Sequence, residues 1–188
     1  MLKNYRYIAF YKPYGVLCQF TGESDDRTLS EFGLPSEVYA VGRLDKDSEG
    51  LLFLTNDGAF NHKVASPKFN KLKTYLVQVE RVPIESDLDK LRKGVLIKGG
   101  MTKPAKVHLL GDLDIPERNP PIRFRKSVPT CWLELKISEG KNRQVRRMTA
   151  AIGHPTLRLI RTHIASLSLD SLKEGEWRDV TKEEVFRL

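Results

Sequence analysis

The sequence has 188 residues, of which 40% are hydrophobic and 30% charged, and its formal net charge is +8. This composition is typical of a soluble globular protein, and the length predicts one domain, or two lobes that share a core. No apolar run approaches the ~20 residues of a transmembrane helix, and the basic start of the chain lacks the apolar stretch of a secretory signal, so neither a membrane protein nor a secreted one is expected.

The positive charge is concentrated in one segment of the chain. Residues 121–161 contain ten Lys or Arg and two acidic residues, whereas the rest of the sequence is balanced. A basic face of this kind indicates a partner with a phosphate backbone, that is, a nucleic acid. A solvated basic surface explains the same count, so charge alone leaves both interpretations open.

Motifs for metals and common cofactors are missing from the sequence. The four histidines have no HExxH-type spacing, and neither GxxxxGK[ST] nor GxGxxG occurs, which argues against a metal site and against ATP or NAD(P) chemistry. Cys18 and Cys131 lie far apart and form no CxxC motif. Two such cysteines suggest a reducing compartment, so we expect a cytoplasmic protein.

The first half of the chain predicts short strands joined by turns. Residues 5–11 alternate and form an expected strand, residues 12–15 a turn, and residues 16–20 a returning strand. One helical turn is expected at residues 28–32. Residues 51–54 read as a short buried strand, and residues 59–65 as a short helix that stops before Pro67.

The second half mixes strands with two longer helices. Strands are expected at residues 73–82, 131–137, 156–160, 164–169 and 177–180, together with two strands folded about Gly99-Gly100 within residues 95–110. Helices are expected at residues 84–93 and 139–153, with a final turn at 181–188, and residues 111–128 read as a long loop. Because there is no regular βαβ rhythm, we predict an α+β fold with a mixed, mainly antiparallel sheet and flanking helices.

Residues 42–58 contain an unusually charged turn directly before the predicted buried strand 51–54. Arg43 and Asp45 stand in this turn, followed by Asp47 and Glu49. A carboxylate beside an arginine at the mouth of a strand is a candidate working group. Alternatively, Asp45 caps the turn and Arg43 is its surface partner.

Short motifs follow one another along the chain: KPxG (12–15), GRLD (42–45), GLL (50–52), TNDG (55–58), KTYLV (73–77), EGKNRQVRRM (139–148) and IGHP (152–155). This ordered set resembles the pseudouridine synthases that act on bacterial ribosomal RNA, of the small-subunit synthase A type. Relatives with an RNA-binding module of the ribosomal S4 type carry it before KPxG, which here begins at residue 12. The chain is therefore most similar to the compact large-subunit members, and we expect a single catalytic domain, residues 1–188, without a separate N-terminal module.

The resemblance implies a pseudouridine synthase fold with a central cleft. It also implies the reaction: the C–N bond of a uridine is broken, the base is turned, and the base is rejoined to the ribose through carbon, with no cofactor and no metal. The implied substrate is bacterial ribosomal RNA, most closely 23S rRNA, and a monomer is expected. Ala165 departs from the family, whose members often have Gly at this position.

The resemblance also assigns roles to individual residues. Asp45 matches the catalytic aspartate, which must be ionised, and Arg146 its basic partner. Tyr75 matches the active-site tyrosine that stacks on the base, and Arg43 the arginine that fills the space of the flipped-out base. Lys141, Arg143 and Arg147 are expected to contact phosphates.

Simpler interpretations of these residues remain open at this point. Tyr75 is also a plausible core aromatic residue, Arg146 a surface arginine, and Arg43 a salt-bridge partner of Asp47 or Glu49. For the whole protein, the alternative is a non-catalytic, ribosome-associated RNA-binding protein. A carboxylate glycoside hydrolase would need a second acid ~5–9.5 Å from the first, and the basic surplus argues against a neutral sugar as substrate.

Overall fold

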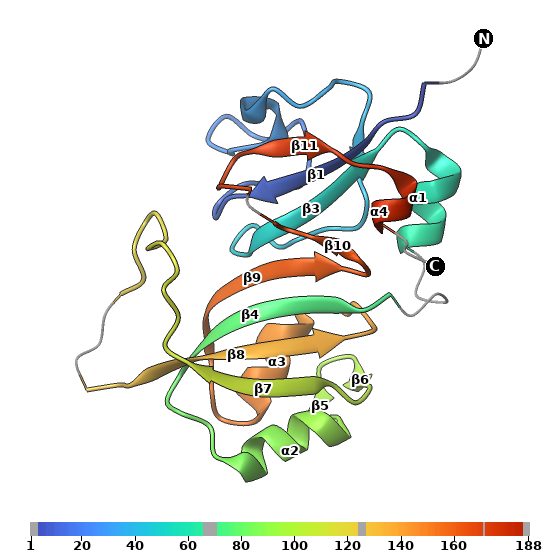
Figure 1. Cartoon of the computed structure of the whole chain (residues 1–188). Helices are drawn as coiled ribbons and strands as arrows, with labels where there is room; N and C mark the ends of the chain where they lie inside the picture. The colour runs from blue at the N-terminus through green and yellow to red at the C-terminus, as the bar shows by residue number, and fades with distance from the viewer. Residues whose placement is uncertain (1–3, 66–70, 124–126, 171, 186–188) are drawn as a thin grey trace. The chain divides into compact units, whose positions relative to one another are not determined.

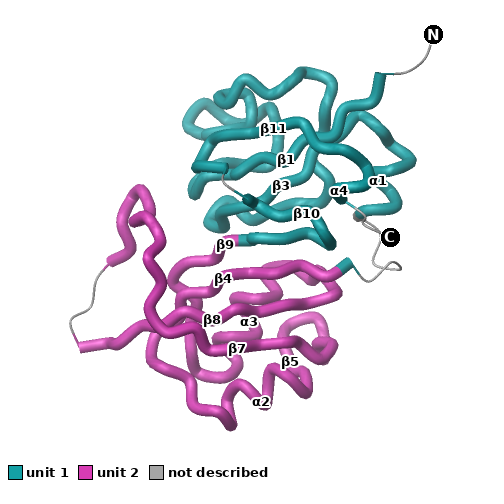
Figure 2. Tube along the Cα trace, in the orientation of Figure 1, with its two compact units in different colours: residues 1–71, 161–188 teal, residues 72–160 magenta. Residues whose placement is uncertain are grey.

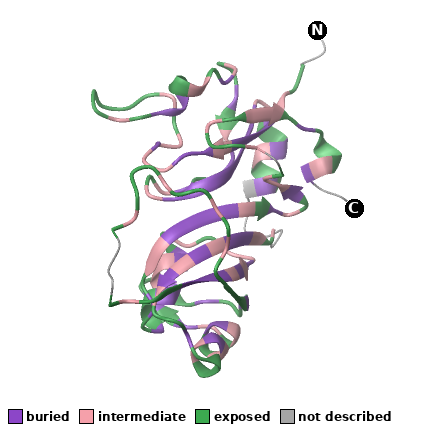
Figure 3. Ribbon diagram, turned by 60° about the vertical axis from the view of Figure 1, so that its left-hand side comes forward, coloured by how far each residue is buried: buried purple, intermediate pink, exposed green. Residues whose placement is uncertain are grey.

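The computed structural model describes residues 4–65, 71–123, 127–170 and 172–185. The chain forms two compact units: unit 1 comprises residues 1–71 and 161–188, and unit 2 residues 72–160 (Figure 2). Buried residues concentrate along the longer strands β1, β3, β4, β8 and β9, whereas loops are mostly exposed (Figure 3). Within the described ranges, no helix has the length and apolar character needed to cross a membrane.

Unit 1 is built on a sheet with the strand order β11-β1-β3-β9, in which β2 also pairs with β3 and β10 with β9 (Figure 1). The strands β1 and β3 are antiparallel, in register from Tyr7 opposite Thr55 to Lys12 opposite Gly50. The elements of this unit are β1 (Tyr7–Lys12), the 3-10 helix η1 (Leu29–Phe32), β2 (Tyr39–Ala40), β3 (Glu49–Thr55), α1 (Gly58–Ala65), β10 (Leu167–Ser168), β11 (Trp177–Asp179) and α4 (Lys182–Val185).

Every residue of β3 is buried, because both faces of the strand are covered. Leu51 and Phe53 pack in a cluster that includes Phe60 of α1. The alternate residues Leu52 and Leu54 pack in a second cluster with side chains from the segment between β1 and β2. This double coverage explains why the strand reads as a continuous apolar run rather than as an alternation.

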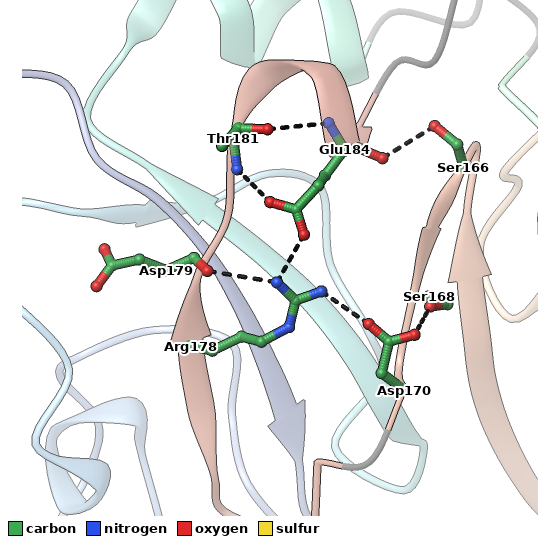
Figure 4. A network of polar contacts seen from close by, with 7 residues as sticks. All are labelled: Ser166, Ser168, Asp170, Arg178, Asp179, Thr181 and Glu184. Atoms are coloured by element: carbon green, nitrogen blue, oxygen red, sulfur yellow. Dashed lines mark hydrogen bonds and ion pairs between the residues drawn. The ribbon is translucent and has the colours of Figure 1, made fainter.

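Side-chain hydrogen bonds fix the ends of the short helices in unit 1. The Asp57 carboxylate accepts a hydrogen bond from the Phe60 N–H at 3.0 Å and caps α1. Near the end of the chain, the Arg178 guanidinium donates to Asp170 at 2.8 Å and to Glu184 at 2.7 Å, and the Thr181 N–H donates to Glu184 at 2.7 Å (Figure 4). This network joins β11 to α4.

Unit 2 carries the strand order β9-β4-β8-β7 and two helices. The strands β4 and β8 are antiparallel over eight residue pairs, and one face of β4 (Tyr75, Val77 and Val79) packs with Leu88 and Leu91 of α2 in a single core. The elements are β4 (Lys73–Glu80), α2 (Glu85–Lys93), β5 (Leu96–Ile97), β6 (Gly100–Met101), β7 (Lys106–Gly111), β8 (Thr130–Ile137), α3 (Gln144–Ala151) and β9 (Thr156–Ile164), whose last four residues belong to unit 1.

Most predicted elements are confirmed, and several differ from the structure in part. Residues 16–20 form no strand, only an isolated bridge between Val16 and Arg27. Residues 95–110 divide into the two-residue strands β5 and β6, which form a sheet of their own, and β7, which pairs with β8. Residues 156–164 form one continuous strand, β9, instead of ending at residue 160.

The basic helix begins five residues later than predicted. Arg143 has a left-handed φ of 48°, so α3 starts at Gln144. The Gln144 side chain accepts a hydrogen bond from the Lys141 N–H at 2.8 Å and donates one to Glu139 at 2.5 Å. These bonds hold residues 139–143 in a loop, because they satisfy polar groups that a helix would otherwise pair.

Candidate active site

The turn that carries Asp45 is tied to the rest of unit 1 through its backbone. Asp45 is partly exposed and follows the buried Leu44. The Asp45 carbonyl accepts a hydrogen bond from the Ser48 N–H at 3.0 Å, and the Lys46 carbonyl accepts one from the Gly15 N–H at 2.8 Å. The KPxG turn and the turn at residues 42–48 are therefore fixed to each other.

Cys18 attaches a second segment to the residue before Asp45. Its sulfur lies 3.2 Å from the Leu44 nitrogen, which donates to it, and 3.2 Å from the Leu44 oxygen, to which it donates. Burial raises the pKa of the Cys18 thiol. A neutral thiol can make both contacts, whereas a thiolate can only accept.

A buried cation, Lys12, lies beside the acidic turn. Its side chain has no exposed surface, and its ammonium group donates to the carbonyls of Pro13 and Val16, each at 2.8 Å. Burial lowers the pKa of Lys12 to about 8, although Cys18, Glu49 and Asp47 act in the opposite direction. Because a buried charge needs partners, Lys12 and the fully buried Glu49 stabilise each other.

Arg161 of β9 adds a second buried cation to this part of unit 1. The side chain is 4% exposed, and its Nε donates to the Leu51 carbonyl at 2.8 Å. Its Nη2 is also buried and has no hydrogen-bond partner in the described part of the chain. We define the buried charge cluster as Lys12, Glu49 and Arg161.

Tyr75 occupies a buried position on β4 in unit 2. It is 8% exposed and belongs to the apolar core of this unit, with Val77 and Val79 on the same strand face. Its hydroxyl group forms no hydrogen bond within residues 4–65, 71–123, 127–170 and 172–185. The ring is therefore held by core packing.

Arg146 is on α3, at the edge of the buried stripe that Val145, Met148 and Ile152 form as predicted. The side chain is partly exposed, and its Nη1 is 3.4 Å from the Thr156 carbonyl, to which it donates. Arg43 and Asp45 belong to unit 1, whereas Tyr75 and Arg146 belong to unit 2. The pairing of Asp45 with Arg146 stays a prediction.

The predicted phosphate contacts cluster at the start of α3. Arg143 is exposed, whereas Lys141 donates to the Met101 carbonyl at 2.6 Å and Arg147 to the Lys98 carbonyl at 3.1 Å. Lys141 and Arg147 thus attach the start of α3 to the β5–β6 hairpin as well as adding positive charge. Among the described residues, no group of three or more His, Cys, Asp or Glu is arranged to hold a metal ion.

The sequence motifs assign no role to the buried charge cluster, although the sequence contains one signal of it. Lys12 follows Ile8 and Phe10 at every second position of β1, and side chains at alternate positions of a strand share one face. The alternation therefore places Lys12 on the buried face of Ile8 and Phe10. The buried position of Arg161 could not be read from the sequence, because the predicted strand ended at residue 160 and left this residue in a loop.

Comparisons with known proteins agree on one family. Residues 6–151 match the family described as RNA pseudouridylate synthase. The chain is 52% identical over 179 residues to the ribosomal large subunit pseudouridine synthase E of Vibrio parahaemolyticus, covering 95% of this chain and 75% of that protein. It is 56% identical over 168 residues to the enzyme of the same name from Xanthomonas axonopodis, covering 88% of each.

A solved structure described as a pseudouridylate synthase confirms the predicted fold class. It superposes with a TM-score of 0.80 at 34% identity and covers 98% of this chain and 74% of its own. The mixed, mainly antiparallel sheet with flanking helices is therefore the pseudouridine synthase fold. On the family match, the sequence identity and the fold together, the chain belongs to the RNA pseudouridylate synthases and is an isomerase that acts on RNA.

Proposed function

We propose that this enzyme converts a uridine of large-subunit (23S) ribosomal RNA to pseudouridine, in the cytoplasm, with Asp45 as the catalytic carboxylate. The observation that carries the choice of RNA is the identity above 50% to ribosomal large subunit pseudouridine synthases E over at least 88% of the chain. In the reaction, the bond between ribose C1′ and uracil N1 breaks, and a bond from C1′ to C5 forms. The C5 proton is lost and N1 gains a proton, so atoms balance without a co-reactant.

The surroundings of Asp45 support its proposed role. The residue is partly exposed, so substrate can reach it, and the hydrogen bonds of Ser48 and Cys18 fix the backbone on either side. A carboxylate that attacks ribose or base must be ionised and correctly placed. In this proposal Arg146 pairs with the carboxylate and favours its ionised form.

Tyr75 and Arg43 have supporting roles in this proposal. Tyr75 stacks on the target base and offers its hydroxyl group near the reacting ring, because core packing already orients the side chain. Arg43 is exposed beside Asp45 and fills the space that the flipped uridine leaves. Extruding a base costs a few kcal/mol, and a planar guanidinium that stacks in the gap offsets part of that cost.

The positive charge at the start of α3 orients the RNA. Arg143 is exposed, and Lys141 and Arg147 keep donor groups beyond those bound to the hairpin carbonyls. Contacts of this kind fix the register of the RNA backbone and carry little sequence information.

The direct test is tritium release from C5-labelled ribosomal RNA that lacks pseudouridine. Wild-type enzyme should release tritium, and Asp45→Asn should bind the RNA with similar affinity but release none. Asp47→Asn is the matched control, because it removes a neighbouring carboxylate of the same turn, and it should keep most activity.

Release by Asp45→Asn at the wild-type rate would overturn the role of Asp45. No release by the wild-type protein despite RNA binding would instead favour the non-catalytic RNA-binding alternative. Mapping pseudouridines in ribosomal RNA from cells with and without the gene identifies the subunit and the uridine.

A further inference from the structure

Unit 2 contains a cavity of about 440 Å³ between its sheet and the loop that follows β7. Gln78 of β4 and Trp132 of β8 are register partners and line its floor, together with Arg158 of β9. Gln78 and Trp132 alternate along β4 and β8 with Tyr75, Val77 and Leu133 of the core, so the cavity lies on the opposite strand face. The volume is within the usual range for small-molecule sites, ~300–1,000 Å³.

The loop over the cavity is held in place by hydrogen bonds. Arg158, which is 5% exposed, donates to the Pro116 carbonyl at 2.7 Å. Arg118 donates to the Pro120 carbonyl within the loop at 2.8 Å. Leu113, Ile115 and Ile122 are partly buried and line the same cavity, so the loop presents apolar side chains toward the sheet.

Charged side chains of both signs and one indole N–H line the cavity without forming hydrogen bonds in the described part of the chain. Asp112, Glu117, Arg123 and the indole N–H of Trp132 all line it, and none of them forms a hydrogen bond within the described ranges of the chain. Three arginines and three acidic residues line the cavity in total, so its charge is balanced. An anion such as a free phosphate is therefore a poor match.

The walls suit a flat, neutral ligand that has both hydrogen-bond donors and acceptors at its edge. Aliphatic side chains and an indole contact the faces of such a ligand, while carboxylates accept from it and guanidinium groups donate to it. A nucleobase has these properties, and unpaired RNA bases are commonly recognised by apolar or aromatic contacts together with hydrogen bonds to the base edge.

We propose that this cavity binds one unpaired base of the RNA substrate, distinct from the uridine that reacts. The inference rests on the proposed function, because it takes RNA as the substrate. It assigns the loop at residues 112–123 to substrate recognition, which supplies base contacts that the phosphate-binding residues of α3 do not provide.

The fluorescence of Trp132 tests the proposal directly. The sequence has two tryptophans, so Trp177→Phe leaves Trp132 as the single reporter, and Asp45→Asn in the same protein prevents turnover. Titration with a single-stranded oligoribonucleotide should change the emission in a saturable manner. An oligomer with the same backbone but no bases should leave the Trp132 emission unchanged. The variant Trp132→Phe, which keeps Trp177 as its only tryptophan, should show no emission change with either oligomer.

Steady-state kinetics provide an independent readout. Arg123→Gln should raise the KM for RNA about tenfold, a loss typical of one recognition contact, with kcat unchanged. Lys106→Gln, which removes one exposed charge on β7 outside the cavity, should change KM less than twofold.

Equal emission changes with the abasic oligomer, or no change while anisotropy shows that the oligomer binds, would overturn the proposal. An unaltered KM for Arg123→Gln would do the same. Tritium release by the wild-type enzyme is measured separately, so the cavity proposal can fail while the proposed function stands.

Discussion

Replacing Lys12 with methionine tests the buried charge cluster beside Asp45. The substitution keeps a long side chain but removes the ammonium group, whose pKa is about 8 in the folded protein against an ordinary value of 10.5. This difference corresponds to a cost of about 3 kcal/mol for holding the charge in the folded state at pH 7. Removing the ammonium group also leaves the carbonyls of Pro13 and Val16 without their hydrogen-bond donor, which lowers the free energy of unfolding by roughly 1–3 kcal/mol for each carbonyl.

Because these two effects oppose each other at pH 7, the decisive quantity is the pH dependence. Between pH 8 and pH 10.5 the unfolded chain keeps the Lys12 proton while the folded protein loses it. The unfolded state then binds more protons, so the free energy of unfolding of the wild type rises with pH. From pH 7 to pH 9 it should rise by about 1 kcal/mol relative to Lys12→Met.

Urea denaturation of both proteins at pH 7, 8 and 9 measures this difference. Groups that titrate equally in both proteins cancel in the subtraction. The control is Lys46→Met, which removes an exposed lysine paired with Asp26 at 2.6 Å and should add no such slope. A wild-type minus Lys12→Met difference that stays constant from pH 7 to pH 9 would show that the ammonium group is not buried as described.

Three further predictions concern the backbone and the basic helix. Gly50→Ala should lower the free energy of unfolding by about 3 kcal/mol. Gly50 has a φ of 102°, and a Cβ at this position would lie 2.7 Å from the backbone nitrogen of Arg161. Wild-type stability of the variant in urea denaturation would contradict this prediction. Ala165→Gly should instead stabilise the protein by about 0.5 kcal/mol in the same assay, since Ala165 has a left-handed φ of 52°. Arg143 has a left-handed φ of 48°, which asparagine tolerates. Arg143→Asn should therefore reduce the slope of log K for RNA binding against log salt concentration by about 1. An unchanged slope would exclude a phosphate contact.

The sequence predicted those elements whose pattern comes from burial. The strands β3, β4 and β8 are confirmed because a covered face imposes an apolar run or an alternation on the chain. The predicted strand at residues 16–20 is wrong because side chains occupy hydrogen-bonding positions of this segment. The Lys12 ammonium group donates to the Val16 carbonyl, and the Cys18 sulfur accepts a hydrogen bond from the Leu44 N–H. Neither contact leaves a periodic signal, and the second joins positions 26 residues apart.

For the site, the motifs identified individual residues but not what surrounds them. Asp45, Tyr75 and Arg146 were named from the resemblance, and their roles stay predictions. A core position for Tyr75 was one of the two interpretations that the sequence left open, whereas the attachment of Arg147 to the β5–β6 hairpin depends on tertiary contacts. The cavity beneath residues 112–123 was equally beyond reach, because the sequence of that loop indicated only that it is long and rich in proline.

The division of the chain has a consequence for the order in which the protein is made. Unit 2 is one uninterrupted segment, whereas unit 1 needs both the first and the last part of the chain. The strand β11 pairs with β1, so β1 gains this neighbour only after residues 177–179 have been synthesised. During synthesis unit 2 therefore has its complete set of contacts before unit 1, whose strand β11 is made after the whole of unit 2.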